Sequence, residues 1–271
     1  MDAPRPARRL GVLGWPVAHS RSPAMHGAAL AALGLAAEGW TYQRLPVPPE
    51  AFTETVRALP AAGFAGANVT IPHKEAALAL ADTATDAARA IGAANTLSFG
   101  PGGSIHADNT DAPGLIAALP WPPAGRTALV LGAGGSARAV AWALKGAGAA
   151  DVAVWNRSPE RAQRLAADLG VRAVPAPARA DLLVNCTSVG LDDRTTAFKD
   201  LPLDADDIVN YTCLVDLVYR DGDTALVTAA RDRGVAVVDG LEFLVRQGAL
   251  SLQAWTGVQA PIDAMRDGAR G

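Results

Sequence analysis

Apolar runs and amphipathic stretches alternate along most of this chain, and the alternation predicts an α/β fold. Residues 128–131 are apolar without interruption, which is typical of a parallel strand covered on both faces. Strands are expected over residues 9–14, 40–47, 66–71, 95–99, 104–107, 128–131, 152–155, 181–186, 209–217 and 235–238. Helices are expected between residues 22 and 34 and over 49–59, 86–91, 159–169, 224–233 and 240–256. Of three further expected helices, one begins at residue 72, one begins at residue 111, and one follows the strand at 128–131 and ends at residue 144.

Two of these helices begin with a serine followed by a proline. Ser22 and Ser158 are expected at the N-cap position, because a serine hydroxyl accepts a bond from the first turn and proline suits the first helical position. Ser22 therefore has an ordinary structural explanation besides any role in binding.

The length and the punctuation of the chain predict two domains. A chain of 271 residues can build two cores, and the proline-rich stretch at 120–125 is the best linker in the sequence. Beyond it, strands and helices alternate as in a doubly wound sheet. No strand follows the long helix at 240–256, so we expect this helix to pack on the first domain, which would make that domain discontinuous.

A glycine-rich turn after the strand at 128–131 resembles a dinucleotide-binding fingerprint. In its GxGxxA form, Gly132 makes the tight turn, Gly134 lets the backbone approach a pyrophosphate, and Ala137 allows close packing of helix on strand. The positive end of the following helix would face the phosphates. An ordinary strand-to-helix turn is the alternative. The candidate cofactor residues here are Gly132, Ala133, Gly134, Gly135, Ser136 and Ala137.

The tip of the next strand favours NADP over NAD. An NAD site usually has an acidic residue there for the ribose hydroxyl, whereas this chain has Asn156, Arg157 and Ser158, with Arg161 one helical turn later. Two guanidinium groups without a carboxylate suit a 2′-phosphate. The alternative is that both arginines are solvated charges on a helix surface.

Composition excludes several classes of protein. Hydrophobic residues make up 50% and charged residues 19%, as in a compact chain and not in a disordered one. The net charge of −3 and the pI near 5.8 argue against nucleic acid or an anionic membrane as partner. No apolar run is long enough to span a membrane, and the basic start lacks the apolar region of a signal peptide, so a cytoplasmic location is expected.

The histidines and cysteines indicate neither a disulfide nor a metal. The two cysteines, Cys186 and Cys213, lie in apolar surroundings and are expected to be buried free thiols. The four histidines and two cysteines show no ligand spacing, so no metal is expected.

Lys74 is the leading candidate for proton transfer. The chain has 24 lysines and arginines together, of which only Lys74, Lys145 and Lys199 are lysines. Arginine stays protonated in proteins, whereas lysine can exchange its proton. A solvated surface lysine is the alternative, as we assume for the other two.

Polar residues gather at predicted strand ends, where parallel sheets bind ligands. Asn68, Thr70 and Lys74 share one strand-to-helix junction, and Asn95 and Asp111 lie at similar junctions. Two further hydroxyls, those of Ser20 and Ser22, follow the first strand and could hold a small polyol or a carboxylate.

Nine motifs, in order, resemble those of the shikimate dehydrogenase family and cover nearly the whole chain. They are GWPVAHSRSPAMH, GANVTIPHKEAAL, IGAANTL, DNTDAPG, LGAGGSARA, WNRSPERA, NCTSVGL, VDLVY and GLEFLVRQGA. The resemblance implies an α/β substrate domain formed by 1–110 and the C-terminal helices of 240–271, a Rossmann-type NADP domain over 111–239, and a cleft where they meet. It also implies reversible NADPH-dependent reduction of 3-dehydroshikimate to shikimate, on the pathway to chorismate and the aromatic amino acids.

The resemblance also implies roles for individual residues. Lys74 and Asp111 match the catalytic pair of the family, and Ser20 and Ser22 match its carboxylate binders. Further substrate contacts are implied for Thr70, Asn95, Tyr219 and Gln247. The cofactor site would comprise residues 132–137 together with Asn156, Arg157, Ser158, Arg161 and Gly240. Phe243 stands where methionine is common in the family, which leaves the shape of the pocket open; His73 and Arg21 are treated as structural.

Two alternatives remain open. An NAD-linked quinate or quinate/shikimate dehydrogenase of the same superfamily would need an acidic residue near Arg157, where Asn156 and Ser158 stand. A noncatalytic ligand-binding regulator that kept the fold is the second alternative, and the presence of both Lys74 and Asp111 speaks against it. The sequence leaves the oligomeric state open, a homodimer included.

Overall fold

The computed structural model describes residues 8–191 and 197–271, so residues 1–7 of the basic start lie outside the described residues. The chain forms two compact units. Unit 1 comprises residues 1–110 and 245–271, and unit 2 comprises residues 111–244. Each unit has a six-stranded sheet of its own.

The sheet of unit 1 is mixed, with the strand order β2-β1-β3-β5-β6-β4. The strands β1, β2 and β3 run parallel, β5 is antiparallel to both of its neighbours, and β4 is parallel to β6. The predicted hairpin around 100–103 is therefore formed by β5 and β6. The bounds are β1 Arg9–Gly14, β2 Thr41–Pro46, β3 Phe64–Val69, β4 Thr83–Ala84, β5 Thr96–Phe99 and β6 Ile105–Asp108.

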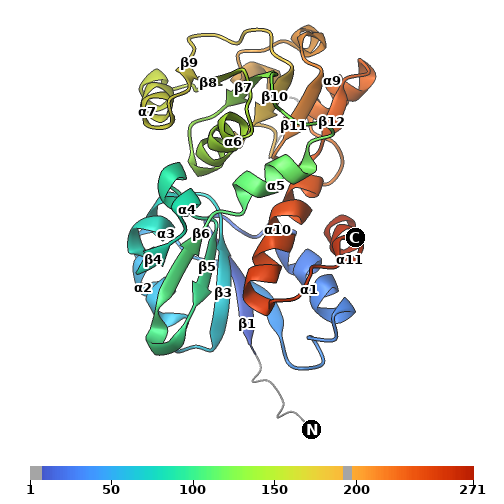
Figure 1. Ribbon diagram of the computed structural model, residues 1–271. Coiled ribbons are helices and arrows are strands. Elements are labelled where there is room, and N and C mark those ends of the chain that lie inside the picture. The colour runs from blue at the N-terminus through green and yellow to red at the C-terminus, as the bar shows by residue number, and fades with distance from the viewer. Residues whose placement is uncertain (1–7, 192–196) are drawn as a thin grey trace. The chain divides into compact units, whose positions relative to one another are not determined.

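Helices cover both faces of this sheet (Figure 1). On one face, Phe52 and Val56 of α2 and Ala77 of α3 pack with Ala67 and Val69 of β3 in a continuous apolar core. On the other face lie α1, α10 and α11. The bounds are α1 Ser22–Ala32, α2 Phe52–Ala58, α3 Lys74–Leu80, α4 Asp86–Ile91, α10 Gly240–Thr256 and α11 Ile262–Arg270, with short 3₁₀ helices at Pro49–Ala51 and Pro101–Gly103.

The sheet of unit 2 is doubly wound, as the alternation of elements predicts. All of its strand pairs are parallel, and the order is β12-β11-β10-β7-β8-β9. The switch point lies between β7 and β10, which is where such sheets bind ligands. The bounds are β7 Thr127–Leu131, β8 Asp151–Trp155, β9 Arg172–Ala173, β10 Leu182–Asn185, β11 Cys213–Asp216 and β12 Ala236–Val238.

Alternate positions of the unit 2 strands face different helices. Leu129 and Leu131 of β7 share a core with Leu226 of α9, whereas α6 contacts β7 and β8 through its own buried face. The bounds are α5 Asp111–Ala118, α6 Gly135–Gly146, α7 Pro159–Leu169, α8 Ala197–Asp200 and α9 Ala225–Asp232, with a 3₁₀ helix at Ala205–Asn210.

Several local predictions are wrong or incomplete. The stretch 209–217 is not one strand, because a 3₁₀ helix with a capping box at Asp204 and Asp207 extends to Asn210 before β11 begins. Neither Ser22 nor Ser158 caps a helix through its side chain: α1 begins at Ser22 itself, and Ser158 occupies the N-cap position without a side-chain cap bond. The helix α11 was not predicted, since Pro261 at its N-cap provides no capping hydroxyl.

Both cysteines are free, but only Cys213 is buried, because Cys186 lies at the open end of β10 and stays half-buried. Burial raises the pKa of the Cys213 thiol to about 11, which keeps it protonated and unreactive. In the described part of the chain, no helix is long and apolar enough to cross a membrane.

Candidate active site

The loop after β1 holds two buried serines. Ser20 and Ser22 are 3% and 5% exposed, and the Ser22 amide donates to the Ser20 hydroxyl at 3.3 Å. Arg44 of β2 donates to the Ser20 carbonyl from Nε at 3.1 Å and from Nη2 at 2.7 Å. Because Ser22 does not cap α1, its burial has no capping explanation. Sequence reasoning missed Arg44, which has no local signal.

Thr70 and Lys74 lie at the junction between β3 and α3. The Thr70 amide donates to the carbonyl of Leu13 at 2.9 Å, which ties this junction to the end of β1. Lys74 begins α3 and is only 9% exposed, and its carbonyl accepts a bond from the Ala94 amide at 2.8 Å. A lysine this deeply buried is not the solvated surface lysine that was the alternative.

His73 has a packing position next to Lys74. Its Nε2 lies 2.7 Å from the carbonyl of Val47, and its ring stacks on Phe52 with centroids 4.3 Å apart. Burial lowers the pKa of this imidazole. These contacts agree with a structural role.

Asn95 and Gln247 come together in unit 1 although 152 positions separate them. The Asn95 amide nitrogen donates to Gln247 Oε1 at 3.2 Å and to the Thr110 hydroxyl at 3.0 Å. The Thr110 amide in turn donates to Asn95 Oδ1 at 2.7 Å. Thr110 was not predicted, although it lies within the DNTD motif, and Asp111 follows it directly at the start of α5.

The glycine turn of unit 2 fits the phosphates of a dinucleotide. Gly132 has a φ of +112° and a Cβ there would lie 3.2 Å from the Cys186 backbone, so no other residue suits the turn. Around Gly134, in contrast, a Cβ would meet nothing within 4 Å, which leaves room for a ligand to approach the backbone. No side chain caps α6, and its first turn carries no acidic residue, as anion binding requires.

Of the two predicted arginines, Arg157 follows the tip of β8 and Arg161 lies in the first turn of α7. Arg157 and Arg161 are exposed, and neither has an ion pair with another described residue of 8–191 or 197–271. The Asn156 amide donates to the carbonyl of Ser158 at 3.0 Å, which shapes the turn between them. Two exposed cations without an ion-pair partner among these residues fit a second phosphate.

A buried carboxylate holds the segment around Tyr219. Asp216, at the end of β11, accepts bonds from Asn185, from the Val218 amide at 3.1 Å and from the Thr224 hydroxyl at 2.6 Å. Gly240 packs on this segment so closely that a Cβ would lie 2.6 Å from the Val218 carbonyl oxygen. Phe243, one turn further along α10, is buried.

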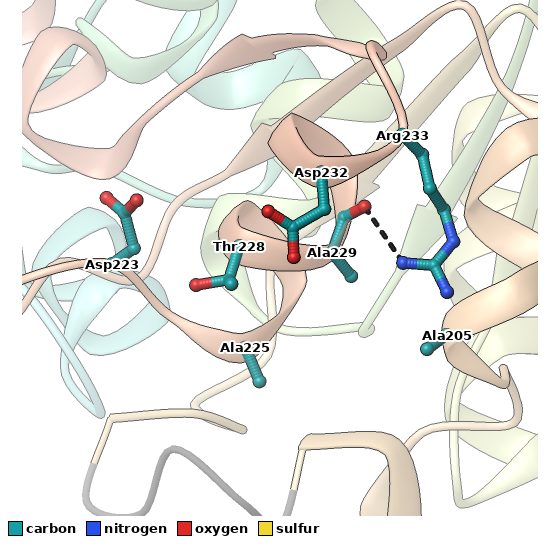
Figure 2. Close-up of a pocket in the computed structure, with 7 residues that line it drawn as sticks. All are labelled: Ala205, Asp223, Ala225, Thr228, Ala229, Asp232 and Arg233. Carbon is teal, nitrogen blue, oxygen red and sulfur yellow. Dashed lines mark hydrogen bonds between the residues drawn. The ribbon is translucent and has the colours of Figure 1, made fainter.

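A separate pocket of about 420 Å³ lies beside α9 in unit 2 (Figure 2). Its lining residues are Ala205, Asp223, Ala225, Thr228, Ala229, Asp232 and Arg233. Arg233 donates to the Ala229 carbonyl at 3.3 Å and to Asp206 at 2.7 Å, so its guanidinium already bonds to other groups of unit 2. None of the predicted site residues lines this pocket. The described residues also contain no group of three or more His, Cys, Asp or Glu side chains that could hold a metal ion.

Three family models match the chain in order. The shikimate dehydrogenase substrate binding domain matches residues 12–97, the shikimate / quinate 5-dehydrogenase family matches 122–187, and the shikimate 5'-dehydrogenase C-terminal domain matches 240–268.

Relatives match over nearly the whole length. The chain is 51% identical to a shikimate dehydrogenase (NADP(+)) of Methylobacterium radiotolerans, covering 92% of this chain and 91% of the relative. It is 44% identical to that of Paracoccus denitrificans, covering 97% and 95%. A crystal structure of shikimate 5-dehydrogenase from Thermus thermophilus, in complex with NADP(H) and shikimate, is 45% identical with a TM-score of 0.86, covering 97% of this chain and 98% of that one.

Proposed function

Because this chain belongs to the shikimate dehydrogenase family, we propose that Lys74 and Asp111 are its catalytic pair. The chain is an NADP-dependent oxidoreductase that acts on a CH–OH group. It catalyses the reversible reduction of 3-dehydroshikimate to shikimate, a step in the synthesis of chorismate and the aromatic amino acids. The observation that carries the residue assignment is the burial of Lys74 among the polar strand ends of unit 1.

Lys74 acts on the ketone oxygen of the substrate. When bound, NADPH supplies the hydride for the ketone carbon. Negative charge then develops on the oxygen, and the Lys74 ammonium stabilises this charge and delivers the proton that completes the hydroxyl. Asp111 orients the ammonium and accepts a bond from a substrate hydroxyl. In the direction of oxidation, Lys74 receives the proton.

The remaining polar residues bind the substrate. Ser20 and Ser22 hold the carboxylate with neutral donors, and Tyr219 adds a further contact. Thr70, Asn95 and Gln247 bind the ring hydroxyls. The bond between Asn95 and Gln247 at 3.2 Å supports this assignment, because it brings two distant motifs onto one polar surface in unit 1.

Unit 2 holds the cofactor in this proposal. Residues 132–137 bind the pyrophosphate at the N-terminus of α6, and Arg157 and Arg161 bind the 2′-phosphate, with Asn156 and Ser158 beside them. Gly240 lies near the nicotinamide. The domain boundaries accordingly assign substrate binding to 1–110 and 240–271 and cofactor binding to 111–239.

A cytoplasmic location completes the proposal. Both cysteines are free thiols, which suits a reducing compartment. Cell fractionation with antibody detection tests this assignment.

The direct test is an assay of the purified chain at the nicotinamide absorbance band. Shikimate and quinate are each combined with NADP and with NAD. We expect turnover with shikimate and NADP to exceed that of the other three pairs. A preference for quinate with NAD would favour the other branch of the superfamily, and no turnover with any pair would favour a regulator.

A further inference from the structure

Three successive turns of α10 meet three successive residues at the start of β5. Gln247 bonds to Asn95 at 3.2 Å, Ser251 lies 2.8 Å from the Thr96 hydroxyl, and the Trp255 indole donates to the Leu97 carbonyl at 3.0 Å. These helix positions are four residues apart and therefore share one face. Gly66 of β3 permits the close approach, since a Cβ there would overlap the Trp255 indole.

The orientation of the two amides follows from the donors around them. The Thr110 backbone amide can only donate, so the Asn95 atom at 2.7 Å from it must be the amide oxygen. The Asn95 nitrogen then faces Gln247 and can only donate, which requires Gln247 to present its oxygen. The contact with Asn95 thus fixes which atom of the Gln247 amide, Oε1, faces Asn95.

Ser251 occupies the centre of this arrangement and is fully buried. Its hydroxyl accepts a bond from the Asn68 amide nitrogen at 2.9 Å and lies 3.1 Å from the Thr110 hydroxyl. It also bonds to the carbonyl of Gln247, one turn earlier, at 3.2 Å. One side chain therefore connects α10 to β3, to β5 and to the segment that carries Thr110.

We propose that Ser251 is a positioning residue for substrate binding, which sets the rotation and height of α10 so that Gln247 and Asn95 present their amides to the substrate ring hydroxyls. The proposal rests on the substrate-binding roles given above for Asn95 and Gln247. Ser251 itself makes no contact with substrate in this proposal and acts through Gln247.

Removal of the Ser251 hydroxyl takes one hydrogen-bond partner from each of two buried polar groups. In Ser251→Ala, the Asn68 amide nitrogen and the Thr96 hydroxyl both lose a bond in a site without solvent access. The helix α10 is then free to shift, because Ser251 no longer ties it to Asn68 and Thr96. We expect kcat/KM for shikimate to fall by about tenfold through KM, the size expected for one misplaced buried bond, while KM for NADP stays unchanged.

The experiment compares Ser251→Ala, Gln247→Ala and the double variant that combines the two. A separate variant, Thr256→Val, is the control. Thr256 lies on the same helix and its hydroxyl also donates one turn back, to Leu252 at 2.8 Å, but it has no bond to a strand among the described residues. We expect Thr256→Val to keep the wild-type KM. If Ser251 acts through Gln247, its substitution in the Gln247→Ala background changes kcat/KM less than about twofold, since the amide it positions is already gone. If Ser251→Ala instead caused a general loss of structure, the losses in kcat/KM of the two single variants would add in full in the double variant. That result would overturn the proposal.

Thr96 tests the same contact from the sheet. Thr96→Val replaces the hydroxyl with a methyl group of similar size, whereas Thr96→Ser keeps the hydroxyl. We expect a raised KM for shikimate in the first and a nearly normal KM in the second. Normal KM in both Ser251→Ala and Thr96→Val, or loss of cooperative unfolding in both, overturns the positioning role. If the wild-type chain does not oxidise shikimate at all, the proposed function itself fails, which is a distinct result.

Discussion

Asn185 donates a hydrogen bond from Nδ2 to Oδ1 of Asp216 at 2.9 Å, between paired positions at the ends of the parallel strands β10 and β11. Asp216 is fully buried, and this burial raises the pKa of its carboxyl to about 6. The pair stands at the carboxyl edge of the unit 2 sheet, beside the segment that carries Tyr219. The protonation state of Asp216 therefore makes the stability of this edge of the unit 2 sheet depend on pH.

Asp216→Asn should flatten the pH dependence of stability between about pH 4 and 6. With a folded pKa of about 6 against an ordinary 3.8, the protonated carboxyl favours the folded state, so this contribution is complete below about pH 4 and is lost as pH rises to about 6. At about 1.4 kcal/mol per pH unit, the loss reaches up to about 3 kcal/mol. Urea unfolding at several pH values measures it. An identical slope in both proteins would contradict the assignment.

Lys74→Met should lower turnover by about 10²-fold or more while the KM for shikimate stays within a few fold, because the variant loses the proton donor and keeps the shape of the side chain. Steady-state kinetics measure both constants. Lys199→Met, at an exposed lysine of α8, is the control and should retain normal turnover. Normal turnover of Lys74→Met would remove the catalytic assignment.

The double variant Arg157→Ala, Arg161→Ala should lose most of the preference for NADP over NAD, since both guanidinium groups are assigned to the 2′-phosphate. The ratio of kcat/KM for the two cofactors reports the change. The control is Arg164→Ala, at an exposed arginine of α7, the helix that also carries Arg161. This variant should leave the ratio unchanged. An unchanged ratio in the double variant would show that the arginines are only surface charges.

Gly134→Ala should separate stability from cofactor binding. The backbone at Gly134 has a negative φ of −91° and open space around a Cβ, so the folded protein should be as stable as wild type or more stable by about 0.4–1 kcal/mol. The added methyl group occupies the approach of the pyrophosphate, so KM for NADP should rise by about tenfold or more, as for one displaced backbone contact. Thermal unfolding and kinetics are compared with Gly146→Ala, which also has open space but lies at the far end of α6.

Arg44→Gln should raise the KM for shikimate by about fivefold and leave the KM for NADP unchanged. The two bonds from this guanidinium to the Ser20 carbonyl hold the loop of Ser20 and Ser22. Glutamine can replace at most one of them, and the loss of the other bond, at about 1 kcal/mol, corresponds to about fivefold. Arg44→Lys, which keeps the charge and one donor, should lie between wild type and Arg44→Gln. Equal KM values in all three proteins would mean that the loop holds its shape without Arg44.

Local patterns predicted most elements of the fold. The alternation of strands and helices identified the doubly wound sheet, and the helices at 86–91, 159–169 and 240–256 begin and end where the sequence places them. These elements are predictable because Thr85 caps the first of them and buried faces repeat with the helical period. The helix α11 was missed although one of its faces is apolar, because Pro261 at its N-cap gives no start signal, and the 3₁₀ helix at 205–210 was missed because its last two residues were assigned to a strand.

Residue order alone was enough to predict the family, the glycine turn at Gly132 and the candidacy of Lys74, because each depends on residue types and backbone preferences that are local to the chain. The folded chain was needed to show that Ser22 does not cap α1, that Arg44 holds Ser20, and that Ser251 joins α10 to β3 and β5. The bond from Asn68 to Ser251 spans 183 positions, and its existence depends on the rotation of one helix against a sheet. No local pattern encodes that rotation, since it results from the packing of many side chains at once.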